Sequence, residues 1–146
     1  HHGHHQIQYE SGESQSNMFG GNSNWRGPIW MPLNYMIIQS LRKYYTFYGD
    51  TYQYEFPTGS GVKLNLKQIA NELTKRLVKL FEPNKEGKYP YHSEDPDQVF
   101  TKDNHFKNEH FFYEFFDGDT GKGLGASHQT GWTSLIANLI MEMDED

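Results

Sequence analysis

The chain contains no cysteine, and no apolar run in it approaches the ~20 residues that a membrane-spanning helix needs. The lack of cysteine excludes disulfides and thiol chemistry and favours a reducing compartment such as the cytoplasm. Basic residues are also scarce, with 13 Lys and Arg against 19 Asp and Glu, which gives a net charge of −6. Because nucleic acids and anionic membranes attract basic surfaces, we expect neither to be the main partner.

Aromatic residues, in contrast, are abundant. They make up 16% of the 146 residues, with ten Tyr, ten Phe and three Trp. The length is that of one domain. Flat rings with a polar edge suit a protein core, and they equally suit a cleft that holds a sugar.

The first 24 residues are rich in Ser, Asn, Gln and Gly and predict a loop. This segment opens with four histidines that could chelate a metal, which are His1, His2, His4 and His5. We interpret them as an added or mobile end and expect no metal there. The folded domain is therefore expected over residues 25–146.

Three amphipathic helices are predicted from apolar residues at helical spacing. The first covers residues 31–48 and is expected to be largely buried, with Pro32 in its first turn and Gly49 just past its end. The second starts after Asn65, which forms a variant capping box with Gln68.

The third helix is predicted over residues 132–143, and the alternation in residues 51–56 and 62–66 predicts a short β-hairpin. Residues 82–110 are polar and acidic and predict a long surface loop. The fold is therefore expected to be mainly α. Long loops do not suit a closed helical bundle, so we expect them to form a functional rim.

Three short motifs resemble metal or phosphate sites but have the wrong residues or the wrong spacing. A calcium loop starting at Asp117 and Asp119 would need Gly where Lys122 stands and Glu where His128 stands. "GKG" is not the Gly-Lys-Ser/Thr of a phosphate loop. "HFKNEH" at 105–110 has one residue too many for an inverted zinc-protease motif. No metal or other cofactor is expected.

Glu114 is the one carboxylate in a strongly aromatic setting, within "FFYEFFDGDTGKGLGASHQTGW" (111–132). One interpretation is a surface Glu on a strand, or a carboxylate paired with Arg26 or a Lys. The other is acid–base chemistry, because a costly, partly buried charge in a cleft suits proton transfer. The residues alone leave both open.

The tract "NSNWRGPIW" (22–30) offers a second candidate surface. Trp25 could stack on a sugar, and Arg26 could donate to hydroxyls or a carboxylate. Both could equally be structural. Trp30, which adjoins the first helix, is expected in the core.

Together, "WRGPIW" with its following helix and "YEFFDGDTGKGLGASHQTGWTSLIANLI" resemble two segments of glycoside hydrolase family 63, the processing α-glucosidases and their relatives. Trehalases are related. The resemblance runs from about Glu13 to Ile140. It implies the C-terminal portion of an (α/α)6 toroid, and inversion at the anomeric carbon by two carboxyl groups.

The resemblance assigns Glu114 as general base. It implies that Trp25 and Arg26 shape a sugar subsite, and that His128 and Gln129 hydrogen-bond sugar hydroxyls or the attacking water. It also implies that the aromatic residues shape the pocket and that the glycines let backbone pass close to sugar and water.

The family's general acid is an Asp well upstream of "WRGPIW", and residues 1–24 contain no Asp. We therefore expect a fragment of an inverting glycosidase for α-glucosides, oligosaccharides or related small glycosides, inactive alone. Its expected protein partner is the remainder of the toroid or a second copy. The alternative is a non-catalytic helical module that binds carbohydrate or a partner chain.

Overall fold

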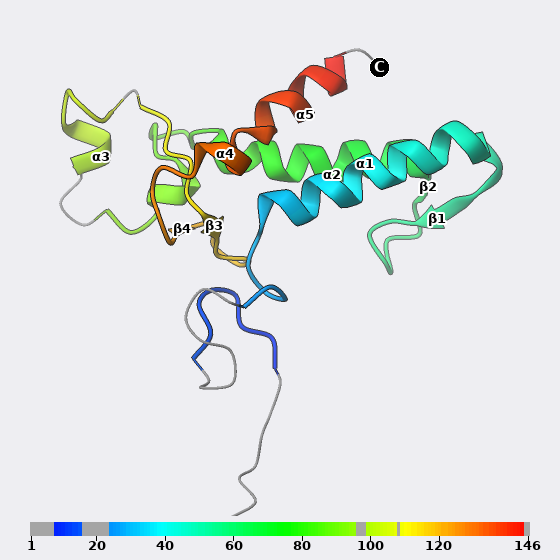
Figure 1. The fold of residues 1–146 in the computed structure, drawn as a ribbon, viewed down its shortest axis with the longest axis horizontal. Helices are drawn as coiled ribbons and strands as arrows, with labels where there is room; N and C mark the ends of the chain where they lie inside the picture. The colour runs from blue at the N-terminus through cyan, green and yellow to red at the C-terminus, as the bar shows by residue number, and fades with distance from the viewer. Residues whose placement is uncertain (1–7, 16–23, 96–98, 108, 145–146) are drawn as a thin grey trace, which may run out of the picture.

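The computed structural model describes residues 8–15, 24–95, 99–107 and 109–144, so the four N-terminal histidines lie outside the described residues. Within these ranges the chain is dominated by helices, as predicted. Helices α1 (Met31–Tyr48), α2 (Leu66–Val78) and α5 (Leu135–Asp144) pack together, with a β-hairpin at one end and the irregular segments at the other (Figure 1).

Helix α1 has the predicted bounds, with proline in its first turn and Gly49 after its last residue. The N–H of Gly49 donates to the carbonyl of Tyr45, and its φ of 58° is one that glycine adopts without strain. The prediction that the helix is largely buried was wrong. Only Met31 and Ile38 are fully covered, and an apolar strip along its outer side is exposed, formed by Met36, Ile37, Tyr44 and Phe47.

Helix α2 begins with the predicted capping box. The N–H of Gln68 donates to Asn65 Oδ1 (2.8 Å), and the N–H of Asn65 donates to Gln68 Oε1 (2.9 Å). The predicted hairpin precedes it, with β1 (Gln53–Glu55) antiparallel to β2 (Lys63–Asn65). A 3-10 turn at Lys79–Phe81 ends this part of the chain shortly before Pro83.

The third predicted helix is interrupted. It consists of the short helix α4 (Thr130–Thr133) and α5, with Ser134 between them. The Ser134 hydroxyl donates to the carbonyl of Thr130, a local bond that competes with the regular helical pattern. Ile136 and Leu139 then anchor α5 in the core.

Residues 82–110 are not simply a surface loop, so this prediction was wrong in part. The segment contains a 3-10 turn at Pro90–His92 and the helix α3 (Val99–Lys102). Tyr91 and His92 are buried, and the His92 ring stacks on Phe100 with centroids 4.0 Å apart. Aromatic packing therefore pulls part of a polar segment into the core.

A second, very short hairpin carries the tract that contains Glu114. Strand β3 (Phe115–Phe116) pairs antiparallel with β4 (Gly123–Leu124). Ile29 adds to the other edge, since its N–H donates to the Phe116 carbonyl (2.7 Å) and its carbonyl accepts from the Phe116 N–H (3.0 Å). The two tracts singled out in the sequence are thus hydrogen-bonded to each other.

Candidate active site

Glu114 stands directly before β3, half-buried, at the open end of the small hairpin. Its N–H donates to the carbonyl of Ala126 (2.8 Å), and its Oε2 accepts from the Ala126 N–H at 3.2 Å. Both backbone and carboxylate are therefore held by the same residue across the hairpin.

Gly125 is required next to this carboxylate. A Cβ at that position would lie 2.5 Å from Glu114 Oε2 and 2.8 Å from Glu114 Cβ, and the φ of Gly125 is +70°. Similar crowding explains why positions 123 and 118 are also glycine. A Cβ on Gly123 would clash with the Tyr113 ring, and a Cβ on Gly118 would clash with the Gly27 carbonyl. The structure thus gives these glycines a role in close packing within the protein. Their expected proximity to sugar and water stays a prediction.

Helix α4 holds the main chain on either side of Glu114. The indole Nε1 of Trp132 donates to the Glu114 carbonyl (3.1 Å), and the Thr133 hydroxyl donates to the Tyr113 carbonyl (2.6 Å). Both residues were predicted to lie in a helix, but their bonds to the main chain around Glu114 were not predicted. The motif Gln-x-Gly-Trp-Thr was the available signal.

A stack of aromatic rings leads from solvent to the residue after Glu114. Trp25 stacks on Trp30 (centroids 4.9 Å apart, planes 16° apart), and Trp30 stacks on Phe115 (4.5 Å, 11°). Trp30 is buried, as predicted, and donates its indole N–H to the Asn24 carbonyl (2.8 Å). Trp25 is 54% exposed, so it is the outer ring of the stack.

The remaining predicted site residues border these elements. Arg26 is exposed beside Trp25, and its N–H donates to Asn24 Oδ1 (3.3 Å). His128 is exposed, with its ring stacked on Phe111 at 5.5 Å.

Gln129 donates its N–H to the Phe112 carbonyl (2.6 Å), which brings it and His128 alongside the segment that leads to Glu114. Their contacts with sugar or water stay predictions.

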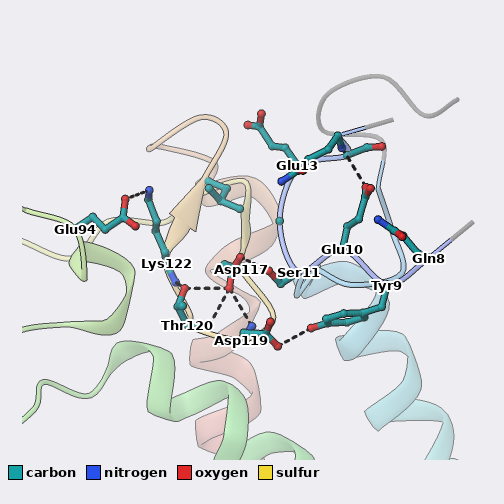
Figure 2. Close-up of a pocket in the computed structure, with 14 residues that line it drawn as sticks. Gln8, Tyr9, Glu10, Ser11, Glu13, Glu94, Asp117, Asp119, Thr120 and Lys122 are labelled. Atoms are coloured by element: carbon teal, nitrogen blue, oxygen red, sulfur yellow. Dashed lines mark hydrogen bonds and ion pairs between the residues drawn. The ribbon is translucent and has the colours of Figure 1, made fainter. Parts of the chain in front are cut away.

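A cavity lies at the opposite end of the hairpin from Glu114. It measures about 800 Å³ and is walled by residues 8–15 and by the turn between β3 and β4, as Figure 2 shows. Glu114 does not line it. Residues 8–15 form no helix or strand, as predicted, but their contact with the turn was not predicted. In this contact Tyr9 donates to Asp119 (2.8 Å) and Ser11 donates to Asp117 (2.7 Å).

Asp117 is the best-bonded carboxylate of this cavity. Burial favours its neutral form, but hydrogen bonds from Ser11, from Thr120 and from the Asp119 N–H outweigh that effect and lower the pKa of its carboxyl. Lys122 pairs with Glu94 at the rim. These bonds hold the turn between the two strands and tie it to the N-terminal segment.

The described residues show neither a metal-binding cluster nor a membrane-spanning helix. They contain no group of three or more His, Cys, Asp or Glu side chains arranged to hold a metal ion. Among the helices in the described ranges, none is both long and apolar enough to cross a bilayer.

Comparison with known proteins places these features in a family. The sequence profile of the mannosylglycerate hydrolase MGH1-like glycoside hydrolase domain matches residues 1–133. The chain is 47% identical over 137 residues to an uncharacterised protein of Saccharomyces cerevisiae, a match that covers 94% of the chain and 13% of that protein.

Two relatives have informative names. The chain is 27% identical over 127 residues to the mannosyl-oligosaccharide glucosidase of Saccharomyces cerevisiae (86% of the chain, 12% of the enzyme). It is 32% identical over 123 residues to a probable mannosyl-oligosaccharide glucosidase of Schizosaccharomyces pombe (84% and 11%). The chain thus spans 11–13% of the length of these relatives. It belongs to the MGH1-like glycoside hydrolase domain family and is related to the mannosyl-oligosaccharide glucosidases.

Proposed function

We propose that this chain is the part of an inverting glycoside hydrolase that carries the general base, Glu114. The observation that carries the proposal is the setting of its carboxylate. Oε2 is held at 3.2 Å by the Ala126 N–H, and the adjacent residue, Phe115, ends an aromatic stack whose outer ring, Trp25, is open to solvent. Membership of a glycoside hydrolase family supports assigning this carboxylate to the attack on a glycosidic bond.

In the proposed reaction, the Glu114 carboxylate takes a proton from a water molecule as that water attacks the anomeric carbon. A second carboxyl group protonates the leaving oxygen on the other side of the bond, about 6.5–9.5 Å from the base. The proton of the water ends on Glu114, and the bond to the leaving oxygen breaks with inversion.

Two of the described carboxylates, Asp117 and Asp95, are poorly suited to be that acid. Asp117 has its pKa lowered by the bonds described above, so it is ionised at neutral pH and has no proton to give. Asp95 accepts from the N–H groups of Val99 and Phe100, the first two residues of α3. We therefore propose that the acid comes from the remainder of a longer protein, whose helices complete an (α/α)6 toroid with α1, α2 and α5.

The substrate proposed is an α-glucoside, an oligosaccharide or a related small glycoside. The names of the relatives and of the family support this class. Trp25 offers a flat apolar face to a pyranose ring. The polar residues that could bind its hydroxyls are Arg26, next to Trp25, and His128 and Gln129, which lie beside Phe112 in the segment that leads to Glu114.

The decisive experiment is Glu114→Gln in a longer protein that contains this chain and hydrolyses a glycoside. We expect turnover to fall by roughly 10²–10⁴-fold with substrate binding retained, because a positioned acid–base group contributes that much. Glu109→Gln, an exposed carboxylate in the same segment, is the matched control and should leave turnover unchanged. Proton NMR of the first product formed should show the inverted anomer. Turnover close to wild type in Glu114→Gln would remove Glu114 from the mechanism.

The isolated chain provides a second test, since it should hydrolyse no activated aryl or fluoride glucoside above background. Activity that Glu114→Gln abolishes would show that the chain, or a second copy of it, supplies the acid.

A non-catalytic carbohydrate-binding module is the other candidate, favoured by the exposed face of Trp25 and by the unsuitable carboxylates. Sugar binding that needs Trp25 but not Glu114, in a longer protein without hydrolytic activity, would establish it instead.

A further inference from the structure

The peptide segment before Glu114 is bonded to a single short helix at three successive residues. The Phe112 carbonyl accepts from the Gln129 N–H (2.6 Å), the Tyr113 carbonyl from the Thr133 hydroxyl (2.6 Å), and the Glu114 carbonyl from the Trp132 indole (3.1 Å). All three donors lie in α4 or directly before it. The first bond belongs to an isolated parallel β-bridge between Phe112 and His128, whereas the other two have side-chain donors and are not strand pairing.

Together with the bond from the Glu114 N–H to the Ala126 carbonyl, these bonds fix the direction in which the Glu114 side chain leaves the backbone. The carbonyls of Tyr113 and Glu114 belong to the two peptide planes that flank its Cα, and each plane is held by one of the two side-chain donors. With both planes held, the carboxylate is directed onto the Gly125–Ala126 backbone, where Oε2 accepts the Ala126 N–H.

The two side-chain donors, Trp132 and Thr133, are held in place by their own contacts. Thr133 is fully buried, and its N–H bonds the Gln129 carbonyl (3.2 Å). The Trp132 ring packs edge-on against Trp30, the middle ring of the aromatic stack, with centroids 6.2 Å apart. A donor locked by packing places its partner more reproducibly than a mobile one.

We propose that Trp132 and Thr133 are positioning residues for Glu114. They touch no reacting atom; they orient the peptide planes that carry the carboxylate. The inference rests on the proposed function only in making Glu114 the general base. The geometry itself can be tested on the isolated chain.

The test is NMR of the isotope-labelled chain over a pH titration. In the wild type, the amide proton of Ala126 should shift with the titration of the Glu114 carboxyl group, because Oε2 accepts from it. Thr133→Val keeps the volume of the side chain but lacks the hydroxyl, and Trp132→Phe keeps a ring but lacks the indole N–H. Each should reduce or abolish the titration shift at Ala126.

Two matched variants separate positioning from a loss of packing. Thr133→Ser keeps the hydroxyl and should restore the titration shift. Thr130→Val makes the same chemical change at an exposed position of the same short helix and should leave the shift intact. Far-UV circular dichroism checks each fold, and Trp132→Phe keeps the test open should Thr133→Val fail to fold.

A full Ala126 titration shift in folded Thr133→Val and Trp132→Phe would overturn the proposal, as would the lack of any such shift in the wild type. In an active longer protein, both variants should lower kcat with little change in KM. If Glu114→Gln left turnover unchanged there while the NMR results held, the proposed function would fail and the positioning would stand.

Discussion

Replacing Gly125 with Ala tests how tightly the backbone closes on the Glu114 carboxylate. The new Cβ would lie 2.5 Å from Glu114 Oε2, 2.8 Å from Glu114 Cβ and 3.0 Å from Phe115 Cε1. Phe115 is buried, so the ring has little room to retreat, and the Glu114 side chain must rotate away.

Two costs add at this position. A side chain at a φ of +70° costs roughly 1–2 kcal/mol, and overpacking adds a further 1–3 kcal/mol or so. The expected loss in free energy of unfolding is therefore about 2–5 kcal/mol. Gly87→Ala is the matched control, because its φ is +79° and no atom lies within 4 Å of its Cβ position. Gly87→Ala should lower the free energy of unfolding only by the cost of the backbone conformation, roughly 1–2 kcal/mol.

Urea unfolding followed by far-UV circular dichroism measures both variants. Any stabilisation from a stiffer unfolded chain applies to both substitutions and cancels in the comparison. Equal losses for Gly125→Ala and Gly87→Ala would refute the reasoning, since they would show that the Glu114 side chain moves aside without cost.

Three further predictions concern other parts of the chain. Burial lowers the pKa of His92, and the charge of Asp95 opposes this effect, so the neutral ring stabilises the fold fully above its unfolded pKa of about 6.5 and this stability is lost as pH falls toward the folded pKa. Urea unfolding at neutral and mildly acidic pH should show the loss. An unchanged dependence of the free energy of unfolding on pH in His92→Phe would contradict the prediction. The exposed apolar strip of α1 should make the isolated chain self-associate and bind an apolar dye. Light scattering should show a smaller particle for the double variant Ile37→Glu/Phe47→Glu than for the wild type. A wild-type monomer that binds no dye would disprove this prediction. Asn65→Ala should lower the free energy of unfolding by roughly 1 kcal/mol through loss of the cap, and a loss near zero in thermal unfolding would show that the cap is unimportant.

The sequence by itself determined the parts of the fold that depend on near neighbours. The capping box joins residues three apart, so Asn65 and Gln68 indicate the start of α2 whatever the helix packs against. The proline in the first turn and the glycine after the last set the bounds of α1 in the same local way. Glu114 was also recognisable, because aromatic residues directly precede it and directly follow it in the sequence.

Only the tertiary structure decided what surrounds Glu114. Ile29 pairs with Phe116, which lies 87 positions further along the chain, and no local pattern encodes that choice. Trp30 and Phe115, which stack on each other, are also far apart in the sequence. The burial of His92 depends on the rings of Phe100 and Phe111, which pack against it. Such contacts form when the core selects among many possible ring partners, and that selection depends on the simultaneous packing of all of them. Residue types therefore singled out Glu114, the family resemblance made it the candidate base, and long-range packing determined how it is held.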